Sequence, residues 1–188
     1  SGIESLVASS LGDSSSEESL EEQLRRQRLR QMGRGISQYT WITGNRILIP
    51  ESGSVYILDS LDSTPRLLVN GEEYPAIDPK ASPDGSSLAF VCKGDIYSIP
   101  IGGGTPSMRT IGGRDGTTRG LADYIAQEEM RRSSGYWWSP DSSLIAFTEV
   151  DETHIPEFHI SHLGKDFSGD SSREIHRYPF AGCDNPQV

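Results

Sequence analysis

Two adjacent carboxylates, Glu128 and Glu129, stand in the stretch DYIAQEEM at residues 123–130. Neighbouring negative charges repel each other, so such a pair is most useful beside a cation. A primary ammonium has three hydrogen-bond donors, and two carboxylates can therefore share it. The alternative is a surface pair that faces solvent or the nearby Arg131 and Arg132, which is common for neighbouring Glu residues. Taken alone, the spacing favours this alternative.

Other groups with chemical potential are weaker candidates. His159 and His162 are three residues apart, with His154 nearby. Positions i and i+3 of a strand point to opposite faces, so we interpret these histidines as packing or surface residues and expect no metal and no other cofactor. The glycines of GGGTP at residues 102–106 indicate a hairpin turn rather than a phosphate loop. A G-x-S-x-G nucleophile elbow does not occur in the 188 residues.

The overall charge excludes some classes of partner. The formal net charge is −10, which argues against nucleic acid or an anionic membrane surface. An apolar run near the roughly 20 residues that span a bilayer is also missing from the sequence. The two cysteines, Cys92 and Cys183, are too few for a disulfide-rich secreted scaffold. Reduced thiols in the cytoplasm are the favoured interpretation.

The first 35 residues differ in composition from the rest of the chain. Residues 1–16 are rich in Ser and acidic residues, which predicts disorder. Residues 17–33 predict a charged helix, because Glu21 precedes Arg25 by four positions and acidic residues lead basic ones. The apolar content of this helix is thin. We therefore expect a solvated charged leader, with a partner-binding helix as the alternative.

Sequence repeats organise residues 36–188. The segment NRILIPESGSVYIL (45–58) aligns with SSLAFVCKGDIYSI (86–99), and SPDGSSLAF (82–90) aligns with SPDSSLIAF (139–147). Units of about 40 to 50 residues with several short strands are typical of β-propeller blades. About three such units are too few to close a ring of roughly 4 to 8 blades. The sequence therefore predicts an all-β fold that is the N-terminal part of a larger propeller.

The two repeat intervals differ in length, and the extra residues fall within 113–137. Because 120–132 contains helix-forming residues, we expect a short helix that emerges from a β-blade. Insertions in a rigid repeat scaffold are frequent places for binding function. The Glu pair lies inside this insertion.

Residues 120–156, GLADYIAQEEMRRSSGYWWSPDSSLIAFTEVDETHIP, are similar to the propeller region of the dipeptidyl peptidase IV family of serine peptidases. The segments YPAIDPKASPDG (74–85) and HRYPFAG (176–182) fit the same pattern, so the resemblance covers about residues 36–188. It implies a propeller that caps an α/β-hydrolase domain. It also implies an enzyme that removes X-Pro or X-Ala dipeptides from peptide N-termini.

The resemblance assigns roles residue by residue. Glu128 and Glu129 match the pair that holds the free N-terminal amine of the substrate. Gln127 stands where some relatives have a third acidic residue, whereas Trp137, Trp138 and Pro140 match scaffold positions. The implied partners are peptides with a free N-terminus and a C-terminal α/β-hydrolase domain of the same chain. A homodimer is compatible with this assignment.

Three departures limit the assignment. The catalytic Ser, Asp and His of such enzymes belong to the C-terminal domain, so this chain supplies no catalytic residue. Relatives place an Arg near the substrate carbonyl, but the segment around Ala76 contains none, and Arg131 replaces a usually acidic residue. An inactive relative, a propeller that only binds proteins, is the alternative function. The presence or loss of the nucleophilic Ser downstream would separate the two.

Overall fold

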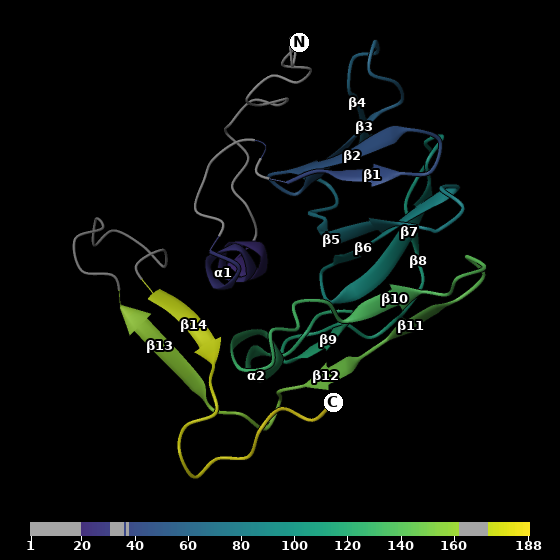
Figure 1. The fold of residues 1–188 in the computed structure, drawn as a ribbon. Coiled ribbons are helices and arrows are strands. Elements are labelled where there is room, and N and C mark those ends of the chain that lie inside the picture. Colours follow the sequence, from purple (N-terminus) through teal and green to yellow (C-terminus); the bar gives the residue numbers. More distant parts are fainter. Residues whose placement is uncertain (1–19, 31–35, 37, 162–172) are drawn as a thin grey trace.

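The computed structural model describes residues 20–30, 36, 38–161 and 173–188 (Figure 1). The predicted disorder of residues 1–16 lies outside these ranges. The described part is mostly antiparallel β-structure with two helices, α1 (Leu20–Arg28) and α2 (Tyr124–Glu128). Neither helix is long and apolar enough to cross a membrane.

Two four-stranded antiparallel sheets follow α1 along the chain. The first contains β1 (Thr40–Ile42), β2 (Arg46–Glu51), β3 (Ser54–Leu58) and β4 (Arg66–Val69), in that order. The second contains β5 (Ile77–Ala81), β6 (Ser87–Cys92), β7 (Asp95–Pro100) and β8 (Ser107–Met108), in the same order. The aligned repeats 45–58 and 86–99 form the central hairpins of the two sheets, which confirms the predicted blades.

Both central hairpins use the same two-residue turn. Glu51 pairs with Ser54 in the first sheet, and Cys92 pairs with Asp95 in the second. The residues between them have positive φ, 48° and 78° in Ser52-Gly53 and 51° and 80° in Lys93-Gly94. Two left-handed residues in succession give a turn whose twist matches that of the strands, and Gly accepts this conformation without a steric cost.

The third unit is divided into smaller strand pairs. Antiparallel pairing joins β10 (Tyr136–Trp138) to β11 (Ile145–Phe147), and β12 (Glu149–Asp151) to β9 (Thr117–Arg119). A separate hairpin of β13 (Glu157–Ser161) and β14 (Arg173–Arg177) extends to one side (Figure 1). Strands occur in 143–150, as the second repeat offset predicts.

The blades stack because each central strand has two apolar faces. Leu88 and Phe90 of β6 belong to the cluster that includes Val55 of the first sheet. Val91 of the same strand packs with Tyr136 of the third unit on the opposite face. Alternate residues of a strand point to opposite sides, so one strand contributes to both interfaces. The structure is thus an all-β partial propeller.

The repeated turns at residues 82–85 and 139–142 are also linked to each other. The carboxylate of Asp84 accepts hydrogen bonds from Ser82 Oγ at 2.5 Å and from the backbone N–H of Ser86 at 3.0 Å. Gly85 and its counterpart Ser142 both have positive φ, 71° and 64°. The backbone N–H of Asp84 donates to Ser142 Oγ at 3.0 Å, so one turn supports the next.

The expected solvated leader is wrong for one face of α1. This helix lies beside β5, the edge strand of the second sheet (Figure 1). Arg25 is 8% exposed, and its guanidinium lies 3.1 Å from the Asp78 carboxylate. A charged partner 53 residues away in the sequence therefore helps to hold the helix in place.

Candidate functional site

The insertion that carries the Glu pair is closed at its base. An isolated antiparallel bridge joins Leu121 to Ser134 where the chain leaves and re-enters the sheet. Gly135 is required here, because a Cβ atom at this position would lie 2.4 Å from the backbone carbon of Leu121. Thr148 Oγ1 donates to the Leu121 carbonyl at 3.2 Å, which ties the base to the end of β11. The helix above it therefore starts from a fixed frame.

Local capping sets the limits of α2. The Asp123 carboxylate accepts a hydrogen bond from the backbone N–H of Ala126 at 3.0 Å, as an N-cap residue does. Arg132 extends back to the same carboxylate at 3.4 Å and also donates to the Ser134 carbonyl at 3.1 Å. Arg131 has a φ of 55°, which stops the helix. The helix is consequently shorter than the range 120–132 suggests.

The Glu pair lies at the carboxyl end of α2. Glu128 is the last helical residue, and Glu129 is the C-cap, with its backbone N–H donating to the Ile125 carbonyl at 2.9 Å. Both side chains are exposed. The predicted alternative partner Arg132 is engaged with Asp123 instead. Glu128 has another partner, Arg28 of α1, whose Nε lies 3.8 Å from its Oε1.

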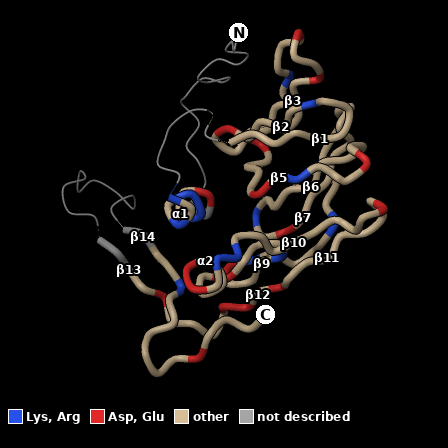
Figure 2. Tube along the Cα trace, viewed as in Figure 1, with Lys and Arg blue, Asp and Glu red and all other residues tan. Residues whose placement is uncertain are grey.

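Arg28 therefore joins the two helices. Its guanidinium carbon lies 5.0 Å from the centre of the Tyr124 ring, within the range of a cation–π contact. Burial lowers the pKa of Arg28, and the negative charge of Glu128 opposes this change. Figure 2 shows basic residues on α1, on the side of the molecule where the acidic end of α2 lies. The carboxyl end of α2 thus already has one cation beside it.

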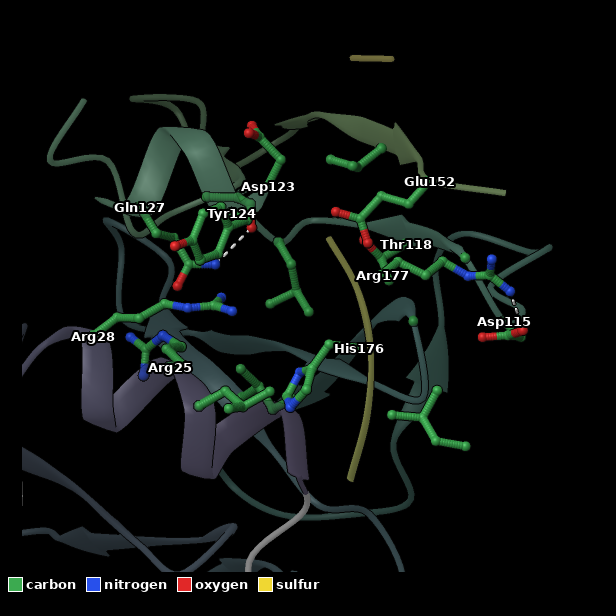
Figure 3. A pocket seen from close by; sticks show the side chains of 18 of the residues that line it. Arg25, Arg28, Asp115, Thr118, Asp123, Tyr124, Gln127, Glu152, His176 and Arg177 are labelled. Carbon is green, nitrogen blue, oxygen red and sulfur yellow. Dashed lines mark hydrogen bonds and ion pairs between the residues drawn. The ribbon is translucent and has the colours of Figure 1, made fainter. Parts of the chain in front are cut away.

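A cavity of about 600 Å³ lies between α1, α2 and the strands around them (Figure 3). Glu128 and Glu129 do not line it, although their neighbours Gln127 and Arg28 do. The Glu pair is therefore at the rim. Gln127 Nε2 donates to the Ala122 carbonyl at 2.7 Å, and its Oε1 is buried without a hydrogen-bond partner among the described residues.

The far side of the cavity carries a second charged cluster. Arg177 of β14 contacts Asp115 at 2.7 Å and Glu157 at 3.0 Å. Glu152 points into the space between this cluster and Asp123 (Figure 3). Burial, together with the nearby Asp123 carboxylate, raises the pKa of Glu152. The cavity is therefore lined by charges of both signs among apolar side chains.

Sequence patterns missed the network that holds α1 to the wall of this cavity. Asp78 has a φ of 51° and lies in a register shift of β5. Its carboxylate contacts Arg25 at 3.1 Å and Lys80 at 2.8 Å. The hydroxyl of the buried Tyr136 lies 2.5 Å from the Asp78 carbonyl. The Asp-Pro dipeptide at 78–79 was the available signal, since a proline inside a strand is atypical of regular pairing.

The histidines considered above are separated in the structure. His154 Nε2 lies 3.1 Å from the Asn185 carbonyl oxygen, and His159 faces Ile175 across the β13–β14 hairpin. His162 lies outside the described residues. Within the described ranges, three His, Cys, Asp or Glu side chains do not come together in a group that could hold a metal ion.

Stacked antiparallel blades with an acidic helical insertion define this protein as part of a β-propeller. Residues 49–188 match the family described as "Dipeptidyl peptidase IV (DPP IV) N-terminal region", and the chain belongs to this family. The resemblance inferred from residues 120–156 is thereby confirmed.

Three relatives illustrate the match. Venom dipeptidyl peptidase 4 of Apis mellifera is 31% identical over 160 residues, which cover 80% of this chain and 20% of the relative. Probable dipeptidyl-aminopeptidase B of Chaetomium globosum is 32% identical over 145 residues, 71% of this chain and 16% of the relative. Prolyl endopeptidase FAP of Mus musculus is 36% identical over 110 residues, which cover 57% of this chain and 14% of the relative. The chain thus spans at most about a fifth of these relatives.

Proposed function

We propose that this chain is the substrate-gating propeller portion of a serine dipeptidyl peptidase that removes X-Pro or X-Ala dipeptides from peptide N-termini. In this proposal Glu128 and Glu129 bind the α-ammonium of the substrate. The observation that carries it is the position of the pair beside a cavity lined by charges of both signs, within the family region 49–188. The names of the relatives, which include dipeptidyl peptidases and a prolyl endopeptidase, support the reaction class.

An amine-binding site explains cleavage after the second residue. An extended residue spans at most about 3.3–3.6 Å, so the bond after residue two lies at a nearly constant distance of about 7 Å from a fixed ammonium. The exposed carboxylates keep their affinity for a cation that arrives from solvent. The carbonyl groups at the carboxyl end of α2 add negative potential in the same place.

The remaining parts of the proposal concern the rest of the protein. The nucleophile, its base and its orienting acid would come from a C-terminal α/β-hydrolase domain, with the cavity facing it. The proposal includes a cytoplasmic setting, a preference taken from the low cysteine content of the sequence. A homodimer is compatible with this arrangement.

Cleavage of matched peptides by the full-length protein tests the proposal. We expect Ala-Pro-p-nitroanilide to be hydrolysed with release of the dipeptide, and its N-acetylated form to be resistant, because acetylation removes the cation. Equal cleavage of both forms would overturn the amine-binding role. Failure of a fluorophosphonate to label the protein, together with no cleavage, would instead support the alternative of a propeller module that only binds.

A further inference from the structure

Arg28 is the cation nearest the proposed amine site. Its Nε lies 3.8 Å from Glu128 Oε1, and this is its one ion pair with a described residue. That distance is beyond hydrogen-bond range. Its side chain is 22% exposed, and it takes part in no hydrogen bond among those found for the described residues. The guanidinium has five N–H donors, and the described residues engage none of them in a hydrogen bond.

The direction of Arg28 matters as much as its charge. It extends from α1 along the wall of the cavity (Figure 3). Glu128 is not among the residues that line the cavity. The Tyr124 ring lies against the guanidinium, with its centre 5.0 Å from the guanidinium carbon. A ligand whose ammonium contacts Glu128 at the rim would therefore have its next atoms beside Arg28 at the mouth of the cavity.

Arg28 is the cation at this point whose donors are least engaged. Arg25, one turn earlier on the same helix, also lines the cavity, but its Nη atoms are paired with Asp78 and Glu22, and only its Nε is buried without a hydrogen-bond partner among the described residues. The carboxylates of Asp115 and Glu157 are paired with Arg177, and that of Asp123 is paired with Arg132. Glu152 is the remaining lining carboxylate; it attracts Arg28 electrostatically and would compete with an anionic ligand, but it forms no ion pair with Arg28 within 4.0 Å among the described residues.

We propose that Arg28 is a specificity-determining residue that selects peptides with an acidic first residue, Asp or Glu. Such a residue carries an ammonium and a carboxylate a few bonds apart. Its ammonium is complementary to Glu128, and its carboxylate is complementary to Arg28. On binding, the substrate ammonium replaces Arg28 beside Glu128, and the substrate carboxylate receives the N–H groups of Arg28. Without Arg28, the negative Glu pair would repel the same carboxylate. This inference rests on the proposed function.

The test compares two nearly isosteric substrates, Asp-Pro- and Asn-Pro-p-nitroanilide, with the full-length protein. We expect kcat/KM for Asp-Pro to exceed that for Asn-Pro by about 3- to 10-fold. This is the effect expected of one partly exposed charge-assisted hydrogen bond between Arg28 and the substrate carboxylate. In Arg28→Gln the ratio should fall to one or below. Arg28→Lys should keep a reduced preference, because a lysine keeps the charge but loses the planar fork.

Arg131→Gln is the matched control, because it removes the same charge from an exposed position just after the Glu pair. It should leave the ratio above one. Hydrogen exchange over residues 20–28 checks that α1 stays docked in each variant. The inference would be overturned by a ratio of one or less in the wild type, or by an unchanged ratio in Arg28→Gln with α1 docked. In either case, cleavage of Asn-Pro-p-nitroanilide would leave the proposed function standing. No cleavage of either substrate would overturn both.

Discussion

Arg25 of α1 and Asp78 of β5 form a buried ion pair, with 3.1 Å between Nη2 and Oδ1, across 53 residues of sequence. Asp78 has a second cation, Lys80 at 2.8 Å, whereas Arg25 has one other ion pair among the described residues, with Glu22 at 3.4 Å. The acid is therefore the centre of the contact between the leader helix and the propeller.

The two partners should respond unequally to substitution. Asp78→Asn leaves a buried guanidinium without its main counter-ion, so we expect a loss of about 3 kcal/mol from the stability of the docked state. Arg25→Gln should cost less, about 1–2 kcal/mol, because Lys80 still compensates Asp78. Hydrogen exchange and denaturant unfolding of the full-length protein measure both effects. Equal losses of stability in the two variants would show that Lys80 does not compensate the charge of Asp78 when Arg25 is replaced.

Gly135 should be intolerant of a side chain. The added Cβ atom would lie 2.4 Å from the Leu121 backbone, which must shift and so disturb the bridge at the base of the insertion. We expect Gly135→Ala to cost about 1–3 kcal/mol or more. Gly102→Ala is the control, because a Cβ atom there meets nothing within 4 Å. Unfolding midpoints that match for the two variants would contradict the role of this close approach.

Asp84 should make part of the stability sensitive to acid. Its hydrogen bonds with Ser82 and Ser86 lower its pKa to about 2, below the usual 3.8. A carboxyl with a lowered folded-state pKa contributes stability that is present above pH 3.8 and is lost as the pH falls toward 2. Asp84→Asn should therefore lose less stability than the wild type between pH 5 and pH 2.

The control for this titration is Asp62→Asn, at an exposed carboxylate away from the repeated turns. Its acid-unfolding profile should follow that of the wild type. If Asp84→Asn also follows the wild-type profile, the turn does not contribute to the acid sensitivity.

Local and repeated features were predictable from the sequence. The hairpins around Gly53 and Gly94 were found because turn residues and strand alternation recur within each unit. The N-cap Asp123 was also predictable, since an Asp just before a helical segment indicates the start of a helix. The docking of α1 was not, because nothing in a charged helix shows that Arg25 and Arg28 meet Asp78 and Glu128. Pairings between charges far apart in sequence depend on how the blades place them.

The same long-range pairing makes the two carboxylates of the Glu pair unequal. Arg28 already compensates part of the charge of Glu128, whereas Glu129 has no ion pair with a described residue. We therefore expect Glu129→Gln to lower kcat/KM for Ala-Pro-p-nitroanilide by about 10- to 150-fold, the value of a hydrogen bond to a charged group. Glu128→Gln should lower it by only about 3- to 10-fold.

Kinetics of the folded full-length variants check this order, with Glu73→Gln as the control at an exposed glutamate outside the insertion. The control should keep the wild-type rate, because solvent and salt screen an exposed charge that contacts neither the insertion nor the substrate. Replacing Arg28 together with Glu128 removes a compensated pair, so the double variant should lose no more than Glu128→Gln alone. Near-wild-type rates in both single Glu variants would show that the pair is a surface feature, and a larger loss in Glu128→Gln would reverse the assigned roles of the two carboxylates.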